Sequence, residues 1–219
     1  MGKKLIKDST LTGIANAIRA KGGTSGTMTP QEMPEKIAAI PTGGDIDALI
    51  DRSITEISSS SVTSIGVGAF FFCSELTTAN FPAATSIGNG AFYYCISLTT
   101  VNFTVATSIG NGAFYSCSSL TTVDFPSASS IGNTAFKSCS NLKSLLLRGN
   151  MVCTLSSKNA FDSTPIASGT GYIYVPSALI EQYKAATNWS TLAAQFRALE
   201  EYTVDGTITG ELDPSKVGV

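Results

Sequence analysis

Apolar side chains return along the middle of this chain at a constant interval of 22 residues. In each copy an isoleucine is followed by an Ala-Phe pair, then a cysteine, a leucine and a closing Phe or Leu. The columns are Ile65, Ile87, Ile109, Ile131; Phe70, Phe92, Phe114, Phe136; Cys73, Cys95, Cys117, Cys139; Leu76, Leu98, Leu120, Leu142; Phe81, Phe103, Phe125, Leu147. Self-similarity at this period predicts a solenoid in which neighbouring coils bury a continuous core.

The pattern inside one copy predicts its local structure. Residues 98–103 end in alternating apolar and polar side chains, as expected for a strand with one buried face. Pro82 and Pro126 follow such strands and stop them. Ser-Ile-Gly-Asn-Gly at 86–90 and 108–112 is typical of turns. The Ala91-Phe92 pair is expected to begin a short helical turn that drops the phenylalanine inward. The predicted fold is an α/β repeat, a leucine-rich-repeat solenoid with a parallel β-sheet.

The array continues beyond its four clear copies. Residues 54–57 precede the equivalent residues 76–79 by one period, which predicts a partial first coil over 45–64. Ala160-Phe161 repeats the Ala-Phe pair after a longer interval, and residues 173–176 echo residues 123–126. We therefore expect a longer fifth coil, and a solenoid domain over 45–176 with about five to six coils.

Both flanks have helical patterns. At the N-terminus, residues 9–21 and 30–40 each place apolar side chains on one helical face, which predicts a helical hairpin over 1–41. Residues 177–201 are expected to form a helical C-terminal cap, because an open coil end exposes apolar side chains. The tail, 202–219, has a candidate hairpin at Asp205-Gly206.

Composition argues against several classes of function. The chain has no histidine, a net charge of −2 and only 14% charged residues, so it lacks a basic patch for nucleic acid and a Ser-His or Cys-His catalytic arrangement. Asp124 has no facing carboxylate for acid–base work. The cysteines have no zinc-ligand spacing, and we expect them to be buried and reduced. We predict no enzymatic activity, no cofactor and no metal.

Two surfaces are candidates for binding a partner. The first is an aromatic stripe behind the Ala-Phe pairs, which could bind sugar rings or a protein, or could simply cover the outer surface. Its members are Phe71, Phe72, Tyr93, Tyr94 and Tyr115. The second is the polar strand face, which could hydrogen-bond to glycans or could merely be solvated. Its members are Asn80, Asn102 and Asp124, flanked by Thr78, Thr100 and Thr122.

The repeated block Ile-Gly-Asn-x-Ala-Phe-x-x-Cys-x-x-Leu-x-x-Val-x-Phe-Pro resembles the BspA-type leucine-rich repeats of bacterial proteins, over roughly residues 50–176. That resemblance implies a surface-exposed, adhesive protein. The segments at 8–19, 28–37 and 174–189 resemble parts of prophage and phage tail-associated proteins. This second resemblance implies a virion component made in the host cytoplasm.

The leading functional hypothesis from the sequence is a phage or prophage tail-associated scaffold that binds a surface glycan or protein. The alternative is a BspA-like bacterial adhesin or host-interaction protein, at the cell surface or secreted by a non-Sec route. The N-terminal lysines precede no apolar signal-peptide region, and no apolar run approaches the roughly 20 residues that cross a bilayer. We therefore expect no Sec signal and no membrane insertion. The N-terminal hairpin is a candidate for assembly with another protein.

Overall fold

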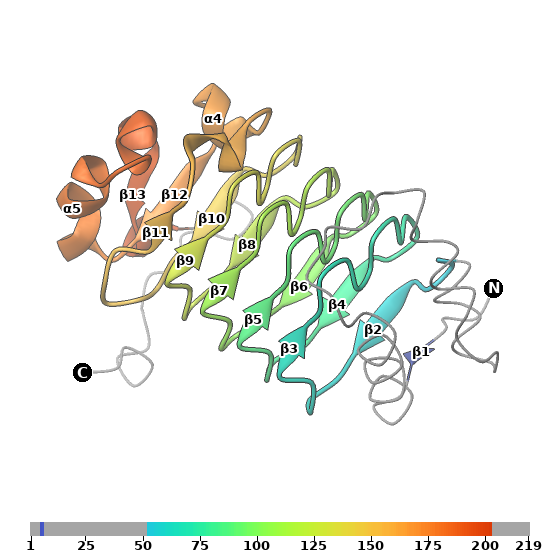
Figure 1. The fold of residues 1–219 in the computed structure, drawn as a ribbon. Coiled ribbons are helices and arrows are strands. Elements are labelled where there is room, and N and C mark those ends of the chain that lie inside the picture. The colour runs from blue at the N-terminus through green and yellow to red at the C-terminus, as the bar shows by residue number, and fades with distance from the viewer. Residues whose placement is uncertain (1–4, 7–51, 203–219) are drawn as a thin grey trace.

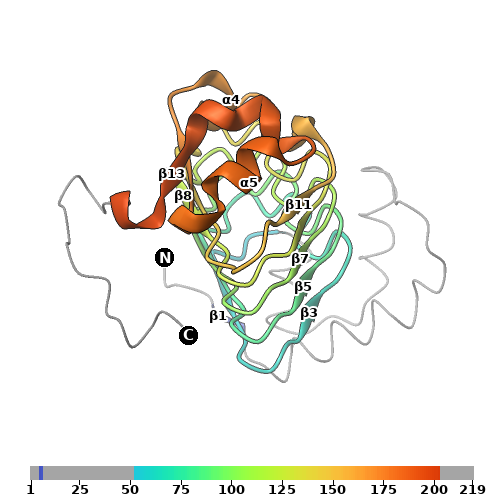
Figure 2. The same ribbon diagram turned by 90° about the vertical axis from the view of Figure 1, so that its left-hand side faces the viewer.

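The computed structural model describes residues 5–6 and 52–202, and these form a row of stacked coils (Figure 1). Most coils contribute one three-residue and one two-residue strand, and Figure 2 shows the strand rows on opposite sides of a tapered cross-section. The longer strands are β2 (Glu56–Ser58), β4 (Thr78–Asn80), β6 (Thr100–Asn102), β8 (Thr122–Asp124), β10 (Ser144–Leu146) and β12 (Tyr172–Val175). The shorter strands are β3 (Ser64–Ile65), β5 (Ser86–Ile87), β7 (Ser108–Ile109), β9 (Ser130–Ile131) and β11 (Thr154–Leu155).

Strand pairing is parallel throughout, and in the regular coils each residue pairs with its equivalent 22 positions later, as Ser86 does with Ser108. The prediction of a parallel solenoid is confirmed, with the difference that the strands form three sheets. The short strands make one sheet of order β11-β9-β7-β5-β3. The long strands divide into two sheets, one of order β1-β2-β4-β6 that begins with β1 (Leu5–Ile6) and one of order β13-β12-β10-β8 that begins with β13 (Phe196–Ala198). The boundary between these two sheets lies between β6 and β8.

The Ala-Phe block differs from the helical turn expected for it. Backbone N–H groups of Ala91, Tyr93 and Cys95 each donate to the carbonyl three residues earlier, which makes a series of tight turns. Gly90 and Tyr94 lie in the left-handed region, with φ of 60° each. A left-handed residue at both points prevents helical hydrogen bonding from continuing, so the chain bends instead. The phenylalanine of the pair still points inward.

Two phenylalanine columns form the centre of the core. The first stacks with ring centroids 5.0 to 5.5 Å apart and consists of Phe70, Phe92, Phe114, Phe136 and Phe161. The second is Phe81, Phe103 and Phe125, all with at most 1% of their surface exposed. The predicted inward columns of isoleucine, phenylalanine, cysteine and leucine are confirmed, since every member is buried.

The cysteines are buried and free, as predicted. Their thiols also form hydrogen bonds from coil to coil, which packing arguments alone did not indicate. The Sγ atoms of Cys95, Cys117 and Cys139 lie 3.0 to 3.1 Å from carbonyl oxygens of the preceding coil, to which they donate. Burial is the main cause that raises the pKa of Cys139 to about 12, so the thiol stays protonated and remains a donor.

The C-terminal segment is only partly helical. After η1 (Lys158–Phe161) and α4 (Pro165–Ser168), the chain crosses β12 and enters η2 (Ser177–Leu179), α5 (Ile180–Ala185) and η3 (Trp189–Gln195). The helical cap expected over 177–201 was wrong at residues 196–198, which form strand β13 (Phe196–Ala198) parallel to β12. The pairing extends the long-strand sheet by one strand, and η4 (Leu199–Glu201) follows it.

Side chains of this segment bind the last coil. The backbone N–H of Cys153 donates to Tyr183 Oη at 2.9 Å, and its carbonyl accepts from Trp189 Nε1 at 2.6 Å. Asn188 Nδ2 donates to the carbonyl of Leu155 at 2.7 Å. These groups would otherwise face the next coil, so side chains replace the missing neighbour at this edge. The Trp189 ring also contacts Phe161, the last ring of the phenylalanine column.

Several predictions fall outside the described residues. The helical hairpin over 1–41 lies there, except that β1 (Leu5–Ile6) pairs in parallel with β2. The candidate hairpin at Asp205-Gly206 lies there too. The partial first coil is confirmed over its described part, because β2 pairs with β4 in the expected 22-residue register.

Candidate binding surfaces

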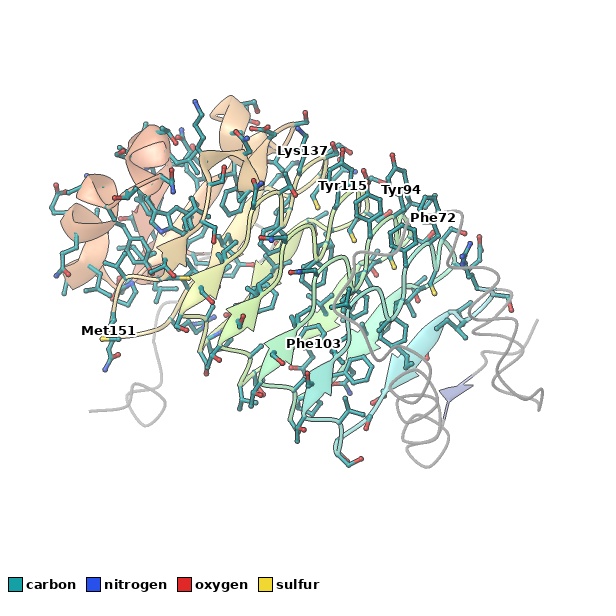
Figure 3. The ribbon with its side chains drawn as sticks, viewed as in Figure 1. Phe72, Tyr94, Phe103, Tyr115, Lys137 and Met151 are labelled. Carbon is teal, nitrogen blue, oxygen red and sulfur yellow. The ribbon has the colours of Figure 1, made fainter. Side chains whose placement is uncertain are left out.

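The predicted aromatic stripe is real, and its side chains form two stacked columns along one edge of the solenoid. Phe71, Tyr93 and Tyr115 make the first, with centroids 4.9 and 4.6 Å apart and ring planes within 17° of parallel. Phe72 and Tyr94 make the second, at 4.8 Å and 2°. Figure 3 shows Phe72, Tyr94 and Tyr115 following one another along this edge, with Lys137 next. We call these five aromatic residues, together with Ile96, the aromatic rim.

Stacking determines which parts of the rings a ligand can reach. One face of each ring lies against a ring of the neighbouring coil, and in Tyr93 both faces do, so ring edges and tyrosine hydroxyls make up much of the surface that a ligand can reach. Tyr94 is the most accessible of the rings, with 38% of its surface exposed. Burial, and then the phenols of Tyr115 and Tyr94, raise the pKa of Tyr93, so its hydroxyl stays neutral and can donate.

In the column of Phe72 and Tyr94, aromatic residues occur only in the first two of the four regular coils. Phe72 and Tyr94 have φ of 60°, a conformation that is unfavourable for bulky side chains. Ser116 and Ser138 hold the same conformation in the next two coils, with φ of 57° and 61°. The backbone therefore does not require an aromatic residue at this position.

Ile96 follows the same logic. Its side chain is 44% exposed. The equivalent positions in the other coils are occupied by serine, at Ser74, Ser118 and Ser140. Exposed apolar groups at two columns of the same coil thus replace serines that the fold accepts. Such a local concentration is typical of an interaction surface rather than of a structural need.

The polar strand face is held together by its own side chains. Asn80 Nδ2 donates to Ser58 Oγ at 3.0 Å, and Asn102 Nδ2 donates to Asn80 Oδ1 at 2.9 Å. The ladder does not continue to Asp124. The carboxylate of Asp124 instead accepts from Arg148 Nε and forms an ion pair with Arg148 Nη2 at 2.8 Å. The predicted members of this face therefore lie in one row but do not form one continuous ladder.

The strand face also changes at the boundary between β6 and β8. Val101 is partly exposed, whereas the equivalent Ala79 and Val123 are buried. The next position of the row after Asn102 is Asp124, whose carboxylate is an acceptor. A carboxylate has no proton to donate, so a side-chain bond cannot form from Asp124 to Asn102.

Sequence reasoning missed a third group of residues on β12 and β13: Tyr172, Tyr174 and Arg197, with Tyr202. The alternation Tyr-Ile-Tyr-Val at 172–175 was a signal, since it places both tyrosines on the outward face of a strand. The approach of Arg197 depends on β13, which the sequence pattern predicted as helix.

Two further features were sought among residues 5–6 and 52–202, a metal-ligand cluster and a membrane-spanning helix. No cluster of three or more potential metal ligands occurs in this part of the chain. None of the helices described there has the length and apolar character that crossing a bilayer requires.

Comparison with known proteins identifies the repeats. The profile of the BspA type leucine-rich repeat region matches residues 48–168 in six copies, which is more than half of the chain. The protein belongs to this family. Leucine-rich repeats are generally non-enzymatic scaffolds, and domains of this kind mediate protein binding. No curated protein matches the chain at a significant level.

Part of the chain is also similar to solved structures of bacterial leucine-rich repeat proteins. One from T. pallidum is 23% identical, with 56% of this chain and 58% of that chain covered and a TM-score of 0.47. One from Bacteroides ovatus is 27% identical, with 60% and 37% covered and a TM-score of 0.43. A leucine rich cell surface protein from Faecalibacterium prausnitzii is 22% identical, with 68% and 40% covered and a TM-score of 0.41. The chain spans less than two thirds of the length of each.

Proposed function

We propose that this BspA-type chain is a binding scaffold whose aromatic rim docks a partner protein. The observation that carries the proposal is the exposed apolar pair Tyr94 and Ile96, at whose positions the next coil has Ser116 and Ser118. Aromatic side chains in such clusters supply much of the energy of protein interfaces. The rim rings are already held by their stacks, so these side chains lose little conformational entropy when a partner binds.

A protein fits the rim better than a glycan does. A sugar ring stacks its C–H groups on an aromatic face, and every rim ring already has one face, and Tyr93 both faces, against a neighbouring ring 4.6 to 4.9 Å away. Ring edges, hydroxyls and the Ile96 side chain suit an apolar side chain packed beside a backbone carbonyl. The strand face supports a glycan no better, because its amides already bond within the face: Asn80 donates to Ser58, and Asn102 donates to Asn80.

The proposal is tested by probing a random-peptide array and a glycan array with the full chain. Tyr94→Ser/Ile96→Ser serves as the matched variant, because it installs the residues that the third coil has at Ser116 and Ser118. Peptide signals that disappear with this variant are expected, with a melting temperature close to that of the parent. Val105→Thr removes a 42% exposed apolar side chain outside the rim and should leave the signals unchanged.

Two results would count against the rim. Peptide binding that survives in Tyr94→Ser/Ile96→Ser would place the interface elsewhere. Glycan signals lost with the same variant would show that the rim takes sugars despite the stacked rings.

The cellular setting that best fits the family is a bacterial surface or host-interaction protein, that is, an adhesin-type scaffold. The family profile covers more than half of the chain, and BspA-type repeats are associated with surface adhesion. A phage or prophage tail component is the second candidate, favoured by the resemblance of segments 8–19, 28–37 and 174–189. Neighbouring genes discriminate between the two. Sortase or secretion genes support the first, and tail and baseplate genes support the second.

A further inference from the structure

A second cluster lies on the outward face of the long-strand sheet, at its C-terminal end. Tyr172 and Tyr174 occupy the two outward positions of β12, and Arg197 on β13 pairs in register with Tyr174 (Figure 1). Tyr202 packs edge to face against Tyr174, with centroids 4.9 Å apart. Burial, and then the phenols of Tyr202 and Tyr172, raise the pKa of Tyr174, while Arg197 lowers it and Glu201 raises it. Strands β12 and β13 and residues 201–202 therefore meet at this cluster, which is separate from the aromatic rim.

Arg197 is held in one orientation. Its Cζ lies 4.3 Å above the centre of the Tyr172 ring. Its Nη1 donates to the carbonyl of Phe196 at 2.7 Å and to that of Ala194 at 3.0 Å. A guanidinium has five N–H groups in a planar fork, so donors on Nε and Nη2 remain for another acceptor. Because the side chain is already ordered, an incoming acceptor does not have to immobilise it.

The floor of the cluster is dry. Leu146 on β10 faces outward, in register with Asp124 and Tyr174, and yet only 1% of its surface is exposed. It does not belong to the interior core, which its neighbour Leu145 joins. A covered apolar side chain on the outer face lowers the local polarity, and hydrogen bonds to charged groups become stronger there.

The charges on this face are unbalanced at Arg197. Arg148, the neighbouring cation, lies against the carboxylate of Asp124 at 2.8 Å. Within the described part of the chain, Arg197 has no carboxylate within ion-pair distance. The arginine is thus oriented, stacked on an aromatic ring and unneutralised, and these properties suit recognition of a carboxylate.

We propose that the Tyr172–Tyr174–Arg197 cluster binds an acidic segment of a partner protein. A glutamate or aspartate carboxylate of that segment accepts from Nε and Nη2 of Arg197. An apolar neighbour in the segment lies on the edges of Tyr172 and Tyr174. The cluster is a second contact, at the opposite end of the described solenoid from the aromatic rim, and it does not depend on the rim.

The test uses two peptides, N-acetyl-Leu-Glu-Leu-amide and N-acetyl-Leu-Gln-Leu-amide, titrated into the full chain. The readout is the NMR signal of the Arg197 side-chain Nε–Hε group, assigned with the Arg197→Gln variant. The glutamate peptide is expected to shift this signal and to bind about tenfold more tightly than its neutral analogue, as a charge-assisted hydrogen bond implies. Added salt should reduce this preference.

Controls distinguish the cluster from general charge effects. Arg197→Gln, for which binding is measured by calorimetry because the reporter signal is absent, should abolish the preference for glutamate. Lys184→Gln also removes one positive charge, from a lysine that pairs with Glu181 on α5, and should leave the preference for glutamate unchanged. Equal binding of the two peptides, or a preference that survives in Arg197→Gln, would overturn the proposal. Binding seen only after the chain is shortened to end at Tyr202 would also overturn it, because residues 203–219 would then be the occupant.

Discussion

The indole nitrogen of Trp189 donates to the carbonyl oxygen of Cys153 at 2.6 Å, across 36 residues of sequence. Both partners are buried, so this hydrogen bond satisfies a backbone carbonyl of the last coil that water does not reach. Trp189→Phe keeps most of the ring and removes the donor. We expect a loss of about 1–3 kcal/mol in the free energy of unfolding, measured by chemical denaturation, because the Cys153 carbonyl stays buried without its partner. Tyr172→Phe, which removes a half-exposed hydroxyl, should cost far less, and equal losses would contradict the role of the indole.

Glycine spacing between coils gives a matched pair of substitutions. A Cβ at Gly110 would lie 2.6 Å from the backbone nitrogen of Asn89, whereas a Cβ at Gly66 meets nothing within 4 Å. Gly110→Ala should therefore separate two coils and lower the melting temperature by several degrees, with a cost of about 2 kcal/mol or more. Gly66→Ala, in the same motif, should change stability by less than about 0.5 kcal/mol. Similar melting temperatures for both variants would show that the coils are not packed this closely.

The phenylalanine column makes a separate prediction. Phe114 has none of its surface exposed and stacks between Phe92 at 5.2 Å and Phe136 at 5.4 Å. Phe114→Ala should cost about 3–5 kcal/mol in unfolding free energy, because it opens a cavity that both neighbouring rings line. Ser116→Ala, two residues away on the surface, is the control. Indistinguishable denaturation curves would refute the inward column.

The buried cysteines predict how stability changes at alkaline pH. Burial raises the pKa of Cys139 and of Cys153 from 9.0 to about 12. The folded chain therefore binds more protons than the unfolded chain between these values, and the unfolding free energy should be fully retained below pH 9 and fall as pH rises toward 12. Denaturant midpoints measured across this range test the direction. A flat profile would mean that the thiols ionise normally in the fold.

Thiol reactivity checks the same burial by another route. At about pH 8, Ellman's reagent should react slowly with the native chain and quickly with all five cysteines after unfolding, because thiolate is the reactive form. Rapid reaction of the native chain would contradict the burial of the thiols and their hydrogen bonds between coils.

The period of the repeat made the fold predictable, because equivalent residues recur in equivalent surroundings. Ile87, Phe92, Cys95 and Leu98 each meet copies of themselves, so their spacing alone implies stacking. The turn at Tyr94 was harder to predict, because a tyrosine rarely adopts the left-handed backbone conformation that it has here. Strand β13 was missed because its partner β12 is a tertiary neighbour, and local helical pattern carries no information about it.

The candidate surfaces were predictable only as sets of residues. Sequence spacing placed Phe71, Tyr93 and Tyr115 on one edge, and the structure confirms that position. Spacing could not tell that the rings stack face to face, and that geometry changes the ligand class that suits them. The Arg197 cluster depends on β13 and on chain segments that meet only in the fold.

Calorimetric titration tests the central claim, that the aromatic rim is a protein-binding surface, most directly. The strongest peptide from the array is titrated into the parent chain and into Tyr94→Ser/Ile96→Ser, with melting curves recorded for both. We predict at least a tenfold weaker Kd for the variant at an unchanged melting temperature, because two exposed apolar side chains contribute binding energy while the fold accepts serine at both positions. Equal Kd values for the two chains would contradict the claim.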